Sequence, residues 1–184
     1  KTALLYAPKL LQILTDRRED IFSRNMPLLL ETVKRCVQAK AHVVERDLRE
    51  TGERMYLNLG HTFGHALESV AGLGTVSHGE AVAWGIARAL VLGKSLGHTD
   101  PTYVDEVLPM LTSYGWCVDA VHPAIAAKIR AGELTGETAA AALLAAMKND
   151  KKKKAGMIRF VLQREINSTF VTEIPDDRVL AVLS

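Results

Sequence analysis

The chain has 184 residues, of which 48% are hydrophobic and 24% are charged, and its formal net charge is +2 at neutral pH. A chain of this length and apolar content can bury a core of ordinary size, so we expect one folded domain and no extensive disorder. The nearly balanced charge lacks the broad basic field that is typical of a nucleic-acid binder. No apolar run approaches the roughly 18 residues that a transmembrane helix needs. The two cysteines, Cys36 and Cys117, lack metal-type or disulfide-type spacing, which favours free thiols in a reducing, cytoplasmic compartment.

The segment from Lys1 to about Asp16 has the apolar spacing of one helix, in which Pro8 could introduce a kink. It opens in mid-pattern without an initiator Met or a cap, so we expect a longer protein that continues upstream. Residues 17–20 are all charged and predict a solvated turn. Pro27 then predicts the first turn of a long helix. The residues expected on the inner face of that helix are Leu28, Leu29, Val33, Cys36, Val37, Ala41 and Val44.

Three of the six histidines lie in one stretch, RMYLNLGHTFGHALESVAGLGTVSHGE, which covers residues 54–80. His61 and His65 are four residues apart in a run of helical apolar spacing that starts at Leu57, so both imidazoles should project from one helix face. The glycines at 72 and 74 end that helix, and Ser77 is a typical cap for a second one. If the two helices fold back on each other, His78 approaches the first two histidines.

Imidazoles that converge from two helices often form a metal or acid–base site, because neutral imidazole is a good ligand for borderline cations. The polar residues Asn58, Thr62, Glu68 and Glu80 flank these histidines. A single histidine in such a helix is more often a hydrogen-bonded core residue, and it is the grouping of three that favours a site. Spacing alone therefore favours a site without deciding its ligands, and it allows His61 and His65 to chelate one cation together.

The remaining sequence predicts further helices and then a change to β-type alternation. The expected helices cover about 101–114 with Pro109 as a kink or break, 123–132, 135–147 with Thr135 as the cap, and a closing one from Pro175. His98 and His122 lie at turns and are expected to be surface or capping residues. Residues 157–162 and 168–173 predict a β-hairpin. We therefore predict a mainly α, multi-helix domain with one small β-hairpin near the C-terminus.

Four segments stand out as motifs. They are KAHVVERDLRETGER (40–54), LNLGHTFGHALE (57–68), HGEAVAWG (78–85) and KNDKKKKAGMIRFVL (148–162). Together they resemble the signatures of the 3-dehydroquinate synthase family, which belongs to the sugar-phosphate cyclase superfamily. The resemblance runs over nearly the whole chain. It implies that residues 1–184 form the C-terminal helical domain that binds metal and substrate, and that the N-terminal NAD-binding domain lies outside this chain.

The resemblance also implies an activity. The family are phosphorus–oxygen lyases of the shikimate pathway, which leads to chorismate and the aromatic amino acids. They use NAD and zinc or cobalt to convert 3-deoxy-D-arabino-heptulosonate 7-phosphate into 3-dehydroquinate and phosphate. The full-length enzyme is expected to be a homodimer. The chain by itself is expected to be inactive.

Site residues follow from the same resemblance, position by position. His61 and His78 match two metal ligands, while His65 matches a histidine that contacts the substrate and its phosphate without binding the metal. Lys1 matches the lysine of an AEVIK motif, which places the third ligand, a glutamate, three residues upstream of it. The other matches are substrate-binding positions at Lys1, Lys40, Arg54 and Asn58, an acid behind them at Glu50, and a phosphate-side lysine at Lys151 or Lys152.

One departure and two alternatives accompany this resemblance. Leu48 stands where the family more often has an acidic residue. A related sugar-phosphate cyclase, or a metal-dependent polyol dehydrogenase, would share the metal ligands and differ at the carboxylate- and phosphate-binding positions. A helical interaction module without catalysis is the third possibility. His65 with Lys40 and Arg54 argues against the first alternative, and the polar clusters within apolar helices argue against the module.

Overall fold

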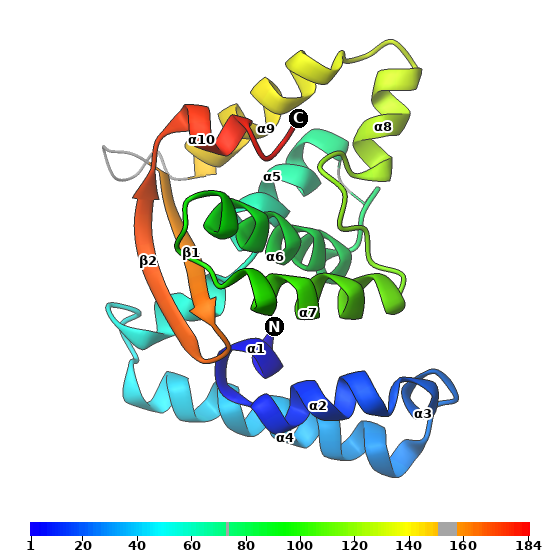
Figure 1. Ribbon diagram of the computed structural model, residues 1–184, viewed down its shortest axis with the longest axis vertical. Helices are drawn as coiled ribbons and strands as arrows, with labels where there is room; N and C mark the ends of the chain where they lie inside the picture. The colour runs from blue at the N-terminus through cyan, green and yellow to red at the C-terminus, as the bar shows by residue number, and fades with distance from the viewer. Residues whose placement is uncertain (73, 151–157) are drawn as a thin grey trace.

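The computed structural model describes residues 1–72, 74–150 and 158–184, and within them the chain is mainly α-helical with one antiparallel hairpin (Figure 1). The helical elements are α1 (Thr2–Tyr6), α2 (Pro8–Asp16), α3 (Arg18–Phe22), α4 (Met26–Arg46), the 3-10 helix η1 (Glu53–Asn58), α5 (His61–Ala71), α6 (His78–Ser95), α7 (Pro101–Ser113), α8 (Pro123–Arg130), α9 (Gly136–Asp150) and α10 (Asp176–Leu180). The strands are β1 (Ile158–Glu165) and β2 (Ser168–Ile174). The predicted fold class is confirmed.

The first two helices differ from the single helix that the sequence predicted. Ala7 separates α1 from α2 with φ −141° and ψ 72°, which lies outside the α-helical region that a following proline disfavours. The predicted turn at 17–20 is also wrong, because α3 begins at Arg18. Glu19 and Asp20 occupy its first turn, where negative charge stabilises a helix N-terminus.

The long helix α4 begins as predicted, with Pro27 in its first turn and the side chain of Asn25 accepting a hydrogen bond from the Leu28 amide at 3.2 Å. Its predicted inner face is partly wrong, because Val33 is 57% exposed and Val37 is 60% exposed. In Figure 1, α4 lies at the outer edge of the molecule, and it contacts α1, α3 and η1. One side of α4 is covered and the apolar stripe that includes these valines is not.

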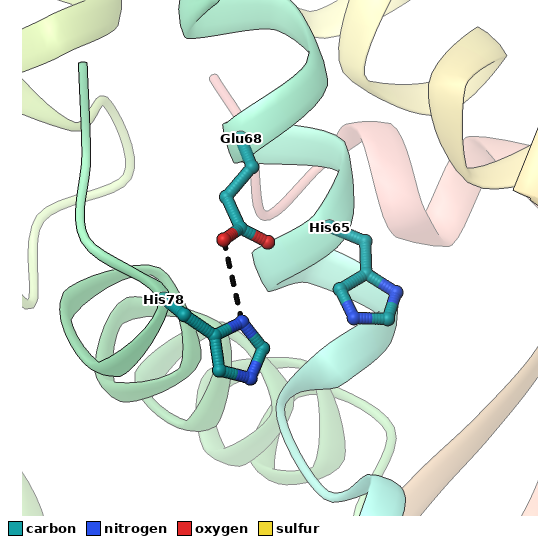
Figure 2. Close-up of side chains that lie close together, drawn as sticks. All are labelled: His65, Glu68 and His78. Carbon is teal, nitrogen blue, oxygen red and sulfur yellow. Dashed lines mark hydrogen bonds and ion pairs between the residues drawn. The ribbon is translucent and has the colours of Figure 1, made fainter. Parts of the chain in front are cut away.

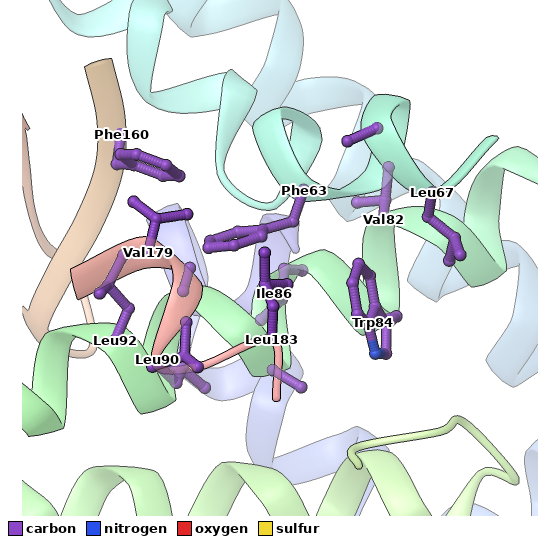
Figure 3. Packing of buried hydrophobic residues seen from close by; sticks show 14 of the residues in the cluster. Phe63, Leu67, Val82, Trp84, Ile86, Leu90, Leu92, Phe160, Val179 and Leu183 are labelled. Atoms are coloured by element: carbon purple, nitrogen blue, oxygen red, sulfur yellow. The ribbon is translucent and has the colours of Figure 1, made fainter. Parts of the chain in front are cut away.

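Helix α6 runs through the centre of the upper part of the molecule (Figure 1), and every residue from 81 to 90 is buried. It contacts α5, α7 and β1. The ring of Phe63 lies between the strand and the helix, with its centroid 5.1 Å from that of Phe160 and 6.3 Å from that of Trp84 (Figure 3). These aromatic contacts fix α5 between the hairpin and α6.

Helices α5 and α6 meet through glycines. A Cβ atom on Gly85 would lie 2.0 Å from the carbonyl oxygen of Gly60, and one on Gly64 would lie 3.0 Å from that of Ala81. Gly60 also has φ +80°, a conformation that glycine adopts without strain. The two backbones are therefore in direct contact where α5 begins.

The ends of this helix pair lie near their predicted positions. Helix α5 ends before Gly72, and Ser77 caps α6 by accepting a hydrogen bond from the Glu80 amide at 3.3 Å. The predicted extension of the first helix back to Leu57 is wrong, because residues 53–58 form η1. The apolar spacing from Leu57 to Phe63 imitates one continuous helix although the chain changes direction at Gly60.

The hairpin is hydrogen-bonded to α1, the first helix of the chain. Asn167 has φ +60° in the turn between β1 and β2. The buried amide of Gln163 donates to the Leu4 carbonyl at 3.0 Å and accepts from the Tyr103 hydroxyl at 2.9 Å. The backbone N–H of Asn167 donates to the same Leu4 carbonyl at 3.0 Å. Residues at opposite ends of the chain thus share one buried polar network.

The later helices begin at or near the capping residues that the sequence predicted. Thr135 accepts from the Thr138 amide at the start of α9, and Pro109 lies inside an unbroken α7. His122 caps α8 as predicted by accepting from the Ala124 amide at 3.2 Å. It is not a surface residue, because it is 2% exposed and packs on Trp84.

Both cysteines are free. None of the described helices has the length and hydropathy needed to cross a bilayer.

The glycine contact predicts the effect of one methyl group. Gly85→Ala should lower the free energy of unfolding by about 2–3 kcal/mol, because the added carbon must push the backbones of α5 and α6 apart. Urea unfolding followed by circular dichroism measures this. Gly136→Ala, at the start of α9 with nothing within 4 Å of its Cβ position, is the matched control and should be neutral or slightly stabilising. Equal effects in the two variants would contradict the contact.

Candidate metal and anion site

The three histidines of the helix pair lie together. His61 and His78 are the first residues of α5 and α6, and His65 lies one turn along α5. The ring centroids of His61 and His78 are 5.3 Å apart, those of His61 and His65 are 5.4 Å apart, and those of His65 and His78 are 5.9 Å apart. The approach expected from the Gly72–Ser77 connection is therefore present, and all three rings face one space.

The Nδ1 atoms of His61 and His78 each face a hydrogen-bond acceptor. The Nδ1 atom of His61 lies 3.2 Å from the Leu59 carbonyl oxygen, and that of His78 lies 3.3 Å from Glu68 Oε1 (Figure 2). Both partners are acceptors, so each Nδ1 carries a proton and each Nε2 keeps its lone pair in the neutral ring. Burial, and then the charge of Lys1, lowers the pKa of His61 to about 4. His61 is thus a neutral base at neutral pH.

These residues fit a divalent cation such as zinc or cobalt. Neutral imidazole nitrogens suit both metals, and His65, Glu68 and His78 can also bring one ligand atom each within 4.8 Å of one another. Figure 2 shows His65 and Glu68 on α5 facing His78 on α6. The geometry allows either His61 with His78, or the set containing Glu68, to hold the ion.

Positive charge lies beside the histidines. Lys1 Nζ donates to the Leu57 carbonyl at 2.8 Å. Burial, and then the charge of Lys40, lowers the pKa of Lys1 to about 8. Lys1, His61 and His78 are among the residues that line a pocket of about 380 Å³. The rest of its lining is mainly apolar and includes Val82, Ile86, Met110, Leu111 and Trp116.

The segment before α5 holds the remaining predicted residues. The Asp47 carboxylate accepts from the amides of Thr51, Gly52 and Arg54 at 2.8–3.1 Å, which fixes the bend after α4. Glu50, with φ +54°, accepts from Asn58 Nδ2 at 2.8 Å and lies 3.9 Å from Arg54 Nε.

The departure at Leu48 does not affect this bend directly. Arg54 Nη1 donates to the backbone carbonyl of Leu48 at 3.1 Å, a contact that any residue at that position provides. The Leu48 side chain is 74% exposed.

The structure thus brings the predicted residues into two adjacent groups. The histidines and Lys1 form the first group, with the charge of Lys40 acting on Lys1, and Glu50, Arg54 and Asn58 form the second, which ends three residues before His61. Lys151 and Lys152 lie outside the described residues. From the sequence, Glu68 was identified only as a polar residue that flanks the histidines, with no role assigned to it. Its position three residues after His65 and seven after His61 was the signal that it shares their helix face.

The chain matches one family of known proteins over most of its length. Residues 1–153 match the family model of the 3-dehydroquinate synthase C-terminal domain. Among curated relatives, 3-dehydroquinate synthase of Pelobacter propionicus is 36% identical over 162 residues, which cover 88% of this chain and 41% of the relative. That of Geobacillus thermodenitrificans is 39% identical over 152 residues, covering 82% of this chain and 37% of the relative. The chain spans about two-fifths of the length of these relatives.

Solved structures share the fold. ValA, a 2-epi-5-epi-valiolone synthase from Streptomyces hygroscopicus subsp. jinggangensis with NAD⁺ and Zn²⁺ bound, matches 99% of this chain and 47% of its own with a TM-score of 0.78 at 23% identity. A 2-deoxy-scyllo-inosose synthase complexed with carbaglucose-6-phosphate, NAD⁺ and Co²⁺ matches 85% of this chain and 41% of its own with a TM-score of 0.64 at 20% identity. On its sequence match over most of its length, the chain belongs to the 3-dehydroquinate synthase C-terminal family.

Proposed function

We propose that this chain is the metal- and substrate-binding C-terminal part of a 3-dehydroquinate synthase. The whole enzyme would convert 3-deoxy-D-arabino-heptulosonate 7-phosphate into 3-dehydroquinate and phosphate in the cytoplasm. The observation that carries the proposal is the convergence of three imidazoles, with ring centroids 5.3–5.9 Å apart, near the ammonium group of Lys1, on which Lys40 acts in turn. Purified native-length protein supplied with this substrate, NAD and zinc should release phosphate.

His61 and His78 are the proposed metal ligands within the chain. Both present Nε2 because Nδ1 is engaged elsewhere, and His61 needs no deprotonation at neutral pH. A glutamate three residues upstream of Lys1 is the proposed third ligand. When bound, the cation would act as a Lewis acid on a substrate oxygen, and NAD would accept a hydride and return it.

The other residues suit an anionic substrate. A sugar acid phosphate carries a carboxylate and a phosphate, and both require cationic and N–H partners. Lys1 stays largely protonated at neutral pH, because its pKa is about 8, and Lys40 and Arg54 add further charge. Asn58 would donate its amide, and Glu50 would hold Asn58 and Arg54 in place. His65, with Lys151 or Lys152, would contact the phosphate.

The rest of the enzyme belongs to the proposal as well. An N-terminal domain would bring NAD to this site, and the whole protein would be a homodimer. A related sugar-phosphate cyclase is the second candidate function, because solved cyclases share the fold. The identity of the curated relatives favours 3-dehydroquinate synthase. Phosphate release from a sugar phosphate without a carboxylate, and none from the heptulosonate, would favour the related cyclase.

The ligand assignment predicts different losses for different histidines. In native-length protein, His61→Ala and His78→Ala should each lose the bound metal and turnover together. His65→Ala should keep the metal and lower the rate by about 100-fold or more, the scale of one positioned proton-transfer or charge-stabilising group. Metal content by elemental analysis and phosphate release measure the two effects.

His98→Ala is the control for this series, because His98 is exposed at the far end of α6 and rests on Phe170. It should change neither quantity. Equal metal loss in His61→Ala and His65→Ala would instead support chelation by that pair. Full metal content in all the variants would refute the site.

The neutrality of His61 predicts a pH dependence. An unfolded histidine takes up its proton near pH 6.5, whereas His61 in the metal-free fold should do so near pH 4. Between these values the unfolded state binds more protons, so stability should fall as the pH falls through this window. Urea unfolding at pH 7.5 and pH 5 should show a larger loss in the unaltered chain than in His61→Gln. A midpoint near 6.5 in an NMR titration of His61 would contradict this.

The missing third ligand predicts weak zinc binding by the 184-residue chain. A catalytic zinc site uses three protein ligands, and here two would act next to the positive charges of Lys1, Lys40 and Arg54. A version extended upstream past the proposed glutamate should bind zinc at least about 100-fold more tightly in a calorimetric titration. Tight and equal binding by both would place the third ligand within residues 1–184.

A further inference from the structure

Glu68 is an acidic side chain in direct contact with one of the three histidines, His78. It projects from α5 towards the first turn of α6, and its Oε1 lies 3.3 Å from His78 Nδ1 (Figure 2). The Glu68 side chain is 28% exposed, whereas that of His78 is 59% exposed. The better-buried partner can therefore orient the more exposed one.

Two roles are compatible with this position. Glu68 could itself bind the cation, because its carboxylate lies within 4.8 Å of ligand atoms of His65 and His78. It could instead fix the orientation and tautomer of the His78 ring. The two roles make different demands on His78, since an Nδ1 atom that donates its proton to Glu68 has no lone pair left to share an ion with that carboxylate, and only Nε2 can then bind the cation.

The arrangement at His61 favours the second role. There the Leu59 carbonyl occupies the same place relative to Nδ1, at 3.2 Å, and a backbone carbonyl in that place leaves Nε2 as the available nitrogen. Glu68 gives His78 the equivalent partner at 3.3 Å. Both rings thus have the same nitrogen engaged and the same nitrogen available, which is the arrangement that suits two ligands of one cation.

We propose that Glu68 is a positioning residue that accepts the Nδ1 proton of His78 and thereby presents Nε2 to the cation, and that it is not itself a ligand. This rests on the proposed function to the extent that His78 binds the metal. The carboxylate should also make the ring more basic and restrict its rotation, and loss of such a partner commonly weakens metal binding by about 10–100-fold.

Two substitutions separate the roles. Glu68→Gln keeps an oxygen that can accept the Nδ1 proton but removes the charge and the ligand ability of the carboxylate, whereas Glu68→Ala removes both. Cobalt affinity of the native-length protein, measured by competition with a chromophoric chelator, should be nearly unchanged in Glu68→Gln and about 10–100-fold weaker in Glu68→Ala. The visible absorption band of bound cobalt, which reports its coordination, should be the same in all of these proteins.

The controls isolate the proposal. Ser69→Ala, at the exposed neighbouring position of α5, should bind cobalt normally, and urea unfolding of the metal-free variants should show that all are folded. A Glu68→Gln variant as weak as Glu68→Ala, a changed cobalt spectrum, or full affinity in Glu68→Ala would each overturn the positioning role. His78→Ala tests the underlying function separately. If it binds cobalt normally, the metal assignment fails, whereas loss of cobalt there with normal binding in Glu68→Ala refutes this inference alone.

Discussion

The contact between the backbones of α5 and α6 is the constraint on which the site depends. With glycine at 60, 64 and 85, the two helices approach until a single extra carbon at Gly85 would overlap a carbonyl oxygen. His61 and His78 are the first residues of these helices, so the separation of their rings follows from the separation of the helix axes. Rigid helices hold ligands more accurately than loops do, and here the rigidity comes from a contact that no larger residue can make.

The electrostatics of the site are set by burial and by the cations around it. Burial disfavours charge on His61, and Lys1 adds to that effect. The positive charges of Lys1 and Lys40 would also repel a metal ion unless anionic groups compensate for them. Among the described residues, Glu68 and Glu50 carry negative charge near the two groups, and the proposed substrate would bring a carboxylate and a phosphate. A site of this kind binds its cation and its anion most strongly when both are present.

Local signals explain which parts could be predicted. Gly72, Ser77 and the apolar spacing of α5 define a helix pair, and Thr135 and Pro27 mark helix starts. Contacts between distant segments could not be predicted in this way. Nothing near Gly60 indicates that its partner is Gly85, and the exposure of Val33 depends on what covers α4. Spacing alone suggested that His61 and His65 could chelate together, because it cannot show which ring nitrogen is already engaged by a carbonyl or a carboxylate.

The network around Leu4 has a consequence for how the protein is made. Lys1 is among the first of these residues to be synthesised, yet the helix that carries it is held through the Leu4 carbonyl by Gln163 and Asn167. The ribosome must therefore add 159 residues after Leu4 to reach Gln163, the first of these two partners. Until then its buried leucines lack part of their cover. Lys1 is thus fixed beside the site late in synthesis, whereas the helix pair that carries the histidines can form earlier.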